Sequence, residues 1–530
     1  MVRAGPDKEG SSEAPVQRGA LPVAAFVAQV NACAVDVVAH TEQALTELAA
    51  LDEQHHFFTV MTPELARAQA QAVTAKIAQG WKGRLAGVPL SVKDCLCVEG
   101  VLSQAGSKAL EGYAPVFSAT AVQRCIDEGA IIVGKTSQDE FGFGSFSTNV
   151  GIGFAVPTNP HDPSRACGGS SGGSAGVTAL TRLPHLSIAE STGGSIASPA
   201  SFCGVAGLCP TYGQVSRYGL LDYANSLDKI GSMGKSVDDA ALLLSVMAGH
   251  DTKDSTSLPD AGFDYSAIAS TRAADGLSPV EGLRIGVLAD FFGEGVLPEV
   301  REHVQRAAQQ LADAGARLKS VSLPLTAKQG VGAYYMTAVT EASTNLAKYC
   351  GIRYGHAPAL SVDEDFNASF TRARSESFGT EAKRRIMLGT FARMAGYRDA
   401  YYIRAAKVRT LILREYEEAF SKVDVLLCPT MPVLPPRFDE IAKLTPLQNY
   451  LMDIMTVGPN LAGLPHLSVP CGWVAADAGR GSAVGGAGGS DTVFLPVGCM
   501  LISPHKREDV LVQAGRIIRP APALAKGDES

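Results

Sequence analysis

Two clusters of glycine and serine, Gly168 to Ser174 and Gly193 to Ser195, constrain this chain more than any other feature. Glycine at this density costs backbone entropy, so it is expected where the backbone must approach another group closely. A flexible Gly/Ser linker is the alternative. However, a strand-like apolar run, Leu186 to Ala189, separates the clusters, and the segment PASFCG follows them. We therefore predict an ordered site in which tight turns direct backbone N–H groups and hydroxyls at one point.

The composition excludes several classes of protein. Of the 530 residues, 46% are hydrophobic and 19% are charged, which is ordinary for a soluble globular chain. The sequence contains no run of 18 apolar residues, so no membrane span is expected. A net charge of −7 without a basic block argues against direct binding of a phosphate backbone. Eleven scattered cysteines favour free thiols in a reducing cytoplasm, and the Cys95/Cys97 pair has no second pair at zinc spacing, so no metal is expected.

The order of helical and strand-like segments predicts an α/β protein. Apolar residues recur at helical spacing over 20–80, where Thr62 and Pro63 open a helix. The segment 210–232 is rich in turn residues and is expected to lack regular structure. Strands are expected at 85–94, 130–133, 186–189, 283–288, 317–323, 425–427, 467–469 and 493–501. Helices are expected at 119–128, 237–248 and 298–314 and over most of 334–420.

No repeat or linker divides the chain, so we expect a single domain over 20–520. A disordered N-terminal tail is expected over 1–19, which is polar, mixed in charge and unlike a signal peptide. A Gly-rich surface insertion is expected over 475–491, and a C-terminal tail over 521–530.

Two well-known motifs match the sequence but fail in their surroundings. Residues 129–136 match the phosphate-loop pattern G-x-x-x-x-G-K-[ST]. Its four variable positions are apolar and mostly β-branched, so they predict a strand rather than a loop that cradles phosphate. Residues 168–172 and 172–176 match the nucleophile elbow G-x-S-x-G, which requires a strand directly before it. The proline-rich segment 157–163 argues against that strand, and we reject both motifs.

The second cluster offers a nucleophile, Ser195. The turn that ends on this serine would present the N–H groups of Thr192, Gly193 and Gly194 as an oxyanion hole, because glycine lets a backbone approach closely. A serine hydroxyl needs a base, and no histidine stands in a comparable motif.

Lys93, within an apolar stretch, is the candidate base, because burial lowers the pKa of a lysine. The alternative is an edge lysine that extends to solvent. Ser170 in the first cluster would relay a proton between Lys93 and Ser195. The result is a Ser–Ser–Lys triad suited to acyl transfer from an amide.

These residues carry a family resemblance. The segments GGSSGGSAG and STGGSIASPASFCG, with SVKD upstream, resemble the amidase signature family. The resemblance implies an α/β fold with a large central mixed β-sheet flanked by helices on both faces. It also implies a Lys, cis-Ser, Ser triad, matched here by Lys93, Ser170 and Ser195. Ser171 is the alternative for the middle serine.

Beyond residue 205 the chain resembles one branch of that family, the A subunits of the glutamyl/aspartyl-tRNA amidotransferases. The resemblance rests on segments such as 210–220, 226–231, 341–355, 383–402 and 453–465. It implies a glutaminase whose glutamine is bound by Tyr334, Arg385 and Asp453. An Arg suits a carboxylate and an Asp suits an ammonium. Without the resemblance, Arg385 and Asp453 would be interpreted as surface ion pairs and Tyr334 as a core aromatic.

The same resemblance implies partners. Ammonia would pass to a B subunit that binds misacylated tRNA and uses ATP with Mg, and a small C subunit would complete a cytoplasmic heterotrimer. No cofactor is expected in this chain itself. The acceptor would be Glu-tRNA(Gln), Asp-tRNA(Asn) or both.

Two departures from the family pattern leave alternatives open. Ser191 and Ala197 stand where the family usually has Asp and Arg. If those two residues normally pair, their joint absence leaves neither charge stranded. Two alternatives to a glutaminase subunit remain, namely a stand-alone small-molecule amidase and a scaffold subunit with a decayed site.

Overall fold

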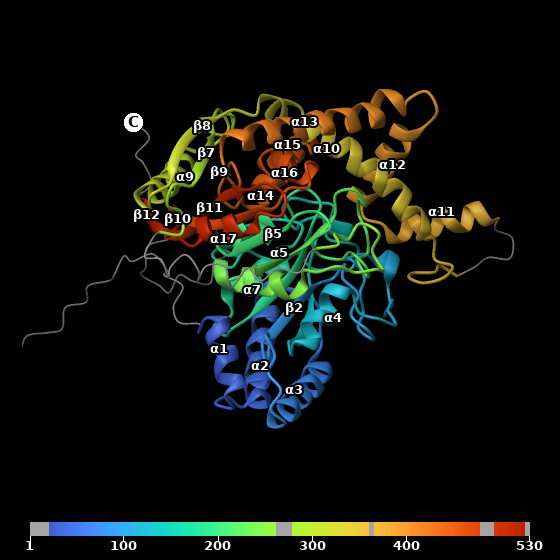
Figure 1. Cartoon of the computed structure of the whole chain (residues 1–530). Coiled ribbons are helices and arrows are strands. Elements are labelled where there is room, and N and C mark those ends of the chain that lie inside the picture. The colour runs from blue at the N-terminus through green and yellow to red at the C-terminus, as the bar shows by residue number, and fades with distance from the viewer. Residues whose placement is uncertain (1–20, 261–277, 360–364, 478–491, 525–530) are drawn as a thin grey trace, which may run out of the picture.

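The computed structural model describes residues 21–260, 278–359, 365–477 and 492–524 (Figure 1). Every strand in these ranges belongs to one mixed sheet of twelve strands, which confirms the predicted α/β class with a large mixed sheet. The strands are β1 (Phe58–Met61), β2 (Pro89–Lys93), β3 (Ile131–Thr136), β4 (Leu186–Ser191), β5 (Ala206–Cys209), β6 (Lys229–Gly234), β7 (Arg284–Leu288), β8 (Arg317–Val321), β9 (Val425–Pro429), β10 (His466–Asp477), β11 (Thr492–Ile502) and β12 (Ala521–Leu524).

The strand order across the sheet is β1-β3-β2-β4-β6-β5-β10-β11-β9-β7-β8, and β12 pairs with β10. Parallel pairs join β2 to β3 and β4, β7 to β8 and β9, and β10 to β12. The other neighbours are antiparallel. The central strands are buried along their whole length, as expected for a sheet covered on both faces.

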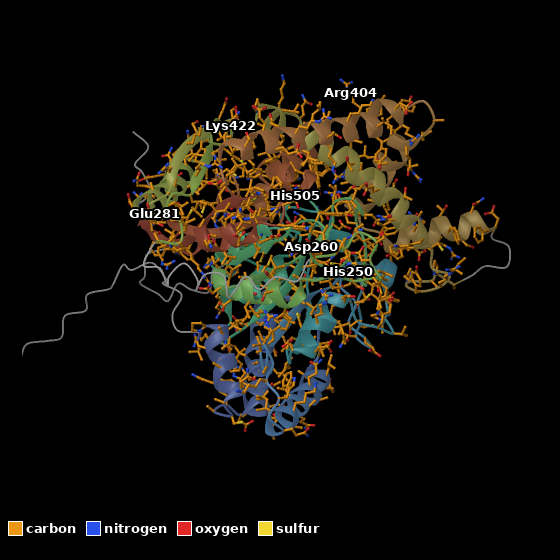
Figure 2. All side chains as sticks on the ribbon, viewed as in Figure 1. His250, Asp260, Glu281, Arg404, Lys422 and His505 are labelled. Atoms are coloured by element: carbon orange, nitrogen blue, oxygen red, sulfur yellow. The ribbon has the colours of Figure 1, made fainter. Side chains whose placement is uncertain are left out.

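Helices surround the sheet (Figure 1), and side chains fill the space between the two, while charged residues such as Arg404 and Lys422 lie on the outside (Figure 2). Among the described residues, none of the helices is both long and apolar enough to cross a bilayer. The longer helices are α1 (Val23–Asn31), α2 (Val37–His55), α3 (Pro63–Ala78), α4 (Thr120–Asp127), α5 (Gly172–Leu180), α6 (Ala197–Cys203), α7 (Val237–Met247), α9 (Pro298–Asp313), α10 (Pro324–Asn345), α11 (Phe366–Ser377), α12 (Thr380–Arg393), α13 (Arg404–Lys422) and α17 (Glu508–Gly515). Shorter turns include η2 (Glu140–Gly142), η5 (Asp399–Ile403), α14 (Phe438–Ile441), α15 (Pro446–Leu451), η6 (Met452–Met455) and α16 (Val457–Leu461).

The register of β2 and β4 places the two glycine clusters together. These strands are parallel neighbours in which Val92 pairs with Ile188. Their carboxyl ends therefore lie at the same edge of the sheet, so Lys93 at the end of β2 comes close to the residues that end β4. The first glycine cluster leads into α5, and the second leads from β4 into α6.

Several boundaries differ from the sequence-based expectations. The helical segment 20–80 contains a strand, β1, and the segment expected to be turns, 210–232, contains the start of β6. Residues 475–477 belong to β10 rather than to the Gly-rich insertion, because they pair with β11. Residues 521–524 form β12 rather than a tail, because they pair with β10. Residues 478–491 and the tail predicted over 1–19 lie outside the described residues.

The structure agrees with the rejection of both motifs. Residues 131–136 of the phosphate-loop match form the buried strand β3, and Lys135 donates to the Ser103 hydroxyl at 2.8 Å inside the core. An irregular loop, not a strand, precedes Gly168. All eleven cysteines are free thiols, as predicted.

Candidate active site

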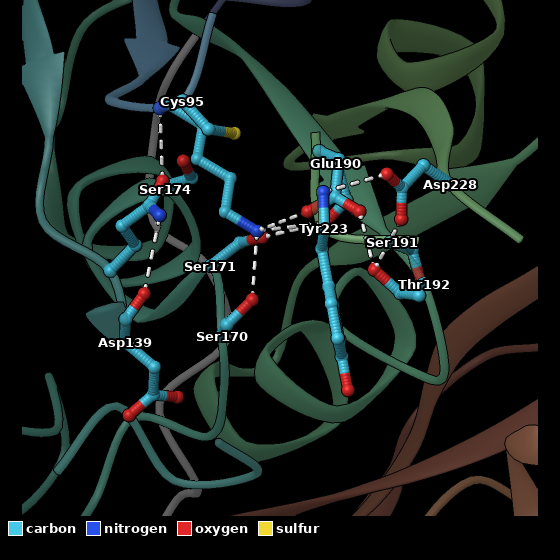
Figure 3. A network of polar contacts seen from close by, with 12 residues as sticks. Cys95, Asp139, Ser170, Ser171, Ser174, Glu190, Ser191, Thr192, Tyr223 and Asp228 are labelled. Atoms are coloured by element: carbon cyan, nitrogen blue, oxygen red, sulfur yellow. Dashed lines mark hydrogen bonds and ion pairs between the residues drawn. The ribbon is translucent and has the colours of Figure 1, made fainter. Parts of the chain in front are cut away.

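Lys93 is completely buried, so the edge-lysine interpretation is wrong. Its Nζ donates to Ser170 Oγ at 2.8 Å, to the Glu190 carbonyl oxygen at 3.0 Å and to Glu190 Oε2 at 2.9 Å (Figure 3). The structure thus brings the predicted base and the predicted relay serine into direct contact. Ser171 Oγ, the alternative, donates to the Glu190 carbonyl at 3.2 Å instead.

The first glycine cluster is packed too tightly for side chains. The Gly169–Ser170 peptide is cis, and Gly168 has a φ of +79°. A Cβ on Gly168 would lie 2.8 Å from Pro199 Cα, and one on Gly169 would overlap the Asp139 carboxylate. Asp139 in turn accepts the N–H groups of Ser147 and of a second loop residue, which fixes the loop against which Gly169 packs. These close approaches explain the glycines of this cluster.

The second glycine cluster forms the turn between β4 and α6, where Ser195 is only 6% exposed. A Cβ on Gly193 would overlap the ring of Tyr334, and one on Gly194 would overlap Thr456. The N–H of Gly194 donates to Ser191 Oγ at 3.2 Å. Of the three N–H groups predicted to form an oxyanion hole, this one therefore already has an acceptor inside the protein.

A small pocket collects most of the predicted residues. Its cavity volume is about 10 Å³, room for roughly one water molecule. Ser195 and the two glycines before it lie on one side, and Tyr334, Arg385 and Asp453 line it with Tyr335. The pocket is completed by Gly142, Gly144 and Gly169. Residues more than 250 positions apart in the sequence thus meet at Ser195.

Arg385, on α12, is 3% exposed and is not the surface residue that its sequence context alone suggested. Its Nε donates to Glu381 Oε1 at 2.8 Å, and its Nη1 donates to the hydroxyl of Tyr223 at 2.7 Å. Four aromatic rings lie 5.1–5.8 Å from its guanidinium, in cation–π range: Phe143, Tyr223, Tyr335 and Tyr450. These contacts hold the cation in place beside the pocket.

Asp453, in η6, accepts a 2.6 Å hydrogen bond from the hydroxyl of Tyr335. Tyr334, the residue assigned by resemblance, stacks edge-to-face on Tyr335 with ring centroids 4.9 Å apart. Burial raises the pKa of Asp453, an effect that Tyr335 opposes by hydrogen-bonding the carboxylate. Burial also raises the pKa of Tyr334 well above its ordinary value, so this phenol stays neutral.

Two buried carboxylates near the pocket have shifted pKa values. Burial raises the pKa of Asp139 to about 6, although backbone N–H groups oppose the shift. Burial likewise raises the pKa of Glu140 to about 7. Glu140 accepts from the Ser107 hydroxyl at 2.6 Å and from the N–H of Gly379 at 2.8 Å, which precedes α12.

Sequence reasoning missed two carboxylates beside the triad. Glu190 pairs with Lys93, and Asp228 shares the hydroxyl of Thr192 with Glu190. A sequence signal for Glu190 was present. It is a charged residue directly after the apolar residues of β4, just as Lys93 is a charged residue within the apolar stretch of β2. Asp228 lies in a turn before β6 and gave no such signal.

The two departures from the family pattern, Ser191 and Ala197, lie in the interior, and Ser191 pairs in the sheet with the buried Lys229. Ser191 and Ala197 are both fully buried. The Ser191 hydroxyl accepts the N–H of Gly194, and Ala197 begins α6.

A mixed sheet with a buried Lys–Ser contact and a glycine turn around a second serine defines an amidase. The family model described as Amidase matches residues 39–512, and the chain belongs to this family. Among curated relatives, the A subunit of glutamyl-tRNA(Gln) amidotransferase from Picosynechococcus sp. is 44% identical over 491 residues, covering 92% of this chain and 95% of the relative. The protein of the same name from Nostoc punctiforme is 45% identical over 476 residues, covering 89% and 92%.

Solved structures agree with this placement. The A subunit of glutamyl-tRNA(Gln) amidotransferase from Thermotoga maritima is 32% identical, covers 90% of each chain and has a TM-score of 0.68. A chain from a vestigial protein complex related to an s-triazine catabolic enzyme is 28% identical, covers 94% of this chain and 98% of its own length, and has a TM-score of 0.77.

Proposed function

We propose that this chain is the glutaminase subunit of a tRNA-dependent amidotransferase. The observation that carries the proposal is the 2.8 Å contact from Lys93 Nζ to Ser170 Oγ. It lies beside a pocket that presents Ser195 together with one cation, Arg385, and one carboxylate, Asp453. The two curated relatives described above, 44–45% identical over about 90% of the chain, support the same assignment.

The proposed reaction begins at Ser195. Its Oγ forms a bond to the side-chain amide carbon of glutamine, while its proton passes to Ser170 and the proton of Ser170 passes to Lys93. The N–H groups of Thr192 and Gly193 stabilise the oxyanion. The amide nitrogen takes a proton back and leaves as ammonia. Water then hydrolyses the glutamyl ester, which releases glutamate and restores Ser195.

The two ends of free glutamine match the charges of the pocket. Arg385 suits the α-carboxylate, because a guanidinium binds a carboxylate in a planar, bidentate manner. Asp453 suits the α-ammonium, and Tyr334 covers the turn that carries Ser195. A cavity with room for about one water molecule is smaller than an amino acid, so binding requires the side chains around it to shift.

The remaining steps belong to partners. Ammonia would pass to a B subunit that binds the misacylated tRNA and holds ATP and Mg, and a C subunit would complete the heterotrimer. The B subunit, and not this chain, would select the acceptor, which is Glu-tRNA(Gln), Asp-tRNA(Asn) or both. The net charge of −7 supports a division of labour in which tRNA is held elsewhere in a cytoplasmic complex.

The test is glutamate release from glutamine by the full chain, with and without the B and C subunits. We expect release that depends on the partners and is lost in Ser195→Ala. No release under either condition, with Ser195→Ala equal to the parent, would show a scaffold subunit with a decayed site.

A second candidate, a small-molecule amide hydrolase, is favoured by one observation. A solved amidase that is 26% identical to this chain has a higher TM-score, 0.73, than the Thermotoga maritima protein, 0.68. Turnover of simple amides by the chain alone, at a rate that exceeds glutamine hydrolysis, would support this candidate over the first.

A further inference from the structure

The carboxylate of Glu190 completes the hydrogen bonding of Lys93. The three acceptors around Nζ are Ser170 Oγ, the Glu190 carbonyl and Glu190 Oε2, all within 3.0 Å (Figure 3). An ammonium has three N–H donors and no lone pair. Lys93 is therefore held in the geometry of an ammonium, which cannot accept the proton of Ser170 as the triad requires.

The surroundings of the pair favour moving one proton. The side chains of Lys93 and Glu190 are 0% and 4% exposed. A buried ion pair carries a desolvation penalty for each charge. Transfer of one proton from Nζ to Oε2 converts both groups to neutral forms without any exchange with solvent. The same transfer gives Nζ the lone pair that a base needs.

A second carboxylate extends this network. The Thr192 hydroxyl lies 2.8 Å from Glu190 Oε1 and 2.8 Å from Asp228 Oδ1. One hydroxyl has one proton and donates to only one of them. The other contact is a good hydrogen bond only if that carboxyl group carries a proton. Burial and the neighbouring Glu190 charge raise the pKa of Asp228 well above its ordinary value, which supports placing this proton on Asp228.

We propose that Glu190 is a positioning residue that acts on the triad through Lys93, by accepting the lysine proton so that Nζ can take the proton of Ser170. This inference rests on the proposed triad. At rest, Lys93 is an ammonium and Glu190 a carboxylate. On activation, one N–H bond of Nζ breaks and an O–H bond forms on Oε2. The Ser170 proton then moves to Nζ and the Ser195 proton to Ser170. When the C–N bond breaks, the amide nitrogen takes the proton that came from Ser195, Ser170 takes its proton back from Nζ, and Nζ takes its proton back from Oε2.

The proposal predicts the pH dependence of Ser195 reactivity. In the parent, reactivity is lost when solvent protonates Glu190, because Lys93 then has no acceptor. In Glu190→Gln, reactivity requires solvent to remove a proton from Lys93 itself. A carboxylate binds a proton at lower pH than an amine does. The acid limb of the pH–rate profile therefore moves to higher pH in the variant.

Other titratable groups face this network and have to be separated from it. Asp139 has a pKa of about 6 and interacts with Lys93, while Lys135 pairs with Asp94 at 3.5 Å. Burial raises the pKa values of three further neighbours away from neutral pH: Cys95, Cys209 and Tyr223. Arg217 faces Asp228. These side chains are present in both the parent and Glu190→Gln, but the variant also removes one cause of the raised pKa of Asp228. The comparison is therefore repeated with Asp228→Asn in both proteins, where a remaining difference between the profiles belongs to Glu190.

The test measures Ser195 directly. A fluorophosphonate ester forms an O–P bond with an activated serine and loses fluoride, and intact mass reports the rate from pH 5 to pH 10. Ser195→Ala establishes the labelled residue. We expect the acid limb of Glu190→Gln to lie about two pH units or more above that of the parent, which is roughly 100-fold slower labelling at a pH below both limbs, with recovery near pH 10. Glu190→Asp should restore part of the parent pH–rate profile. Ser171→Ala keeps the charges of Lys93 and Glu190, so its acid limb should lie at the same pH as that of the parent.

Four outcomes overturn the inference. Superimposable profiles for Glu190→Gln and the parent would show that Glu190 does not act through Lys93. Faster labelling of Glu190→Gln at neutral pH would show that Glu190 only locks the ammonium. If Glu190→Gln does not fold, the parent and Glu190→Asp decide. An acid limb of the parent above pH 8 contradicts a carboxylate acceptor, as does a lower limb that does not move in Glu190→Asp, because that limb then belongs to another group such as Asp139. No labelling of the parent at any pH, with or without the partner subunits, would remove the triad and the inference together. A labelled parent that does not hydrolyse glutamine would instead refute the proposed function alone.

Discussion

The hydroxyl of Tyr335 donates a 2.6 Å hydrogen bond to Oδ2 of Asp453. The carboxylate proposed to bind the glutamine ammonium is thus oriented by the residue after Tyr334, the tyrosine assigned by resemblance. We predict that Tyr335→Phe raises the KM for glutamine at least about tenfold, because a hydrogen bond to a charged group contributes roughly 1.5–3 kcal/mol. The rate constant kcat should change less. Steady-state glutamine hydrolysis measures both.

Tyr334→Phe is the matched control for Tyr335→Phe. Its ring would still cover Gly193, so packing beside Ser195 is kept while the hydroxyl is removed. A rise of KM in Tyr334→Phe without a rise in Tyr335→Phe would contradict the role given to Tyr335.

The middle position of the triad is tested by exchanging neighbours. Ser170 Oγ accepts from Lys93 Nζ at 2.8 Å, whereas Ser171 Oγ donates to a backbone carbonyl. We predict that Ser170→Ala lowers kcat by about 10³-fold or more, as loss of one triad member does in other serine hydrolases. Ser171→Ala should stay within about one order of magnitude of the parent, because one neutral hydrogen bond is lost. Equal losses in the two variants would contradict the assignment.

The tight turn before Ser195 gives a steric prediction. A Cβ on Gly193 would overlap the Tyr334 ring, so Gly193→Ala must displace that ring or the turn. We expect kcat/KM for glutamine to fall at least about tenfold, since small misplacements of reacting groups have large effects on rate. Gly332→Ala is the control. It lies on the same helix as Tyr334, is exposed and has open space for a Cβ, so activity should be kept and Tm unchanged or raised. A fully active Gly193→Ala would show that the turn tolerates a side chain.

The triad could be proposed from sequence because its chemistry is concentrated in short segments of unusual composition. Glycines at 168, 169, 193 and 194 have no room for a Cβ, and that requirement is visible in the sequence as a cluster. The partner of Arg385 on its own helix, Glu381, stands four residues earlier, at a spacing that predicts contact. By contrast, Tyr223 reaches Arg385 from 162 residues away, and no local pattern indicates such a contact.

The strand β6 was missed for a physical reason. β6 reads Lys-Ile-Gly-Ser-Met-Gly, which has low β-propensity, yet it is buried between β4 and β5 and paired on both sides. Tertiary pairing, not local preference, makes it a strand. The same holds for Glu190, whose charge ends the apolar run but which lies within β4 because its backbone pairs with Ile230 of β6.

The buried Glu140 gives a prediction about stability and pH. Its pKa is raised to about 7 in the folded chain, against 4.5 for the unpaired side chain. Between these values the folded state holds a proton that the unfolded state has released. Raising the pH across this range therefore weakens the folded state, by up to about 3 kcal/mol.

Glu140→Gln removes this effect because glutamine has no proton to lose. Its carbonyl can accept from the N–H of Gly379, and its amide can donate to the Ser107 hydroxyl, so both contacts are kept. We expect the variant to gain stability over the parent at pH 8 and to gain little at pH 5, as measured by denaturant or thermal unfolding at both values. Glu53→Gln, at an exposed position on α2, should show no such difference. An equal effect of Glu140→Gln at pH 5 and pH 8 would mean that Glu140 is ionised throughout this range in the folded chain.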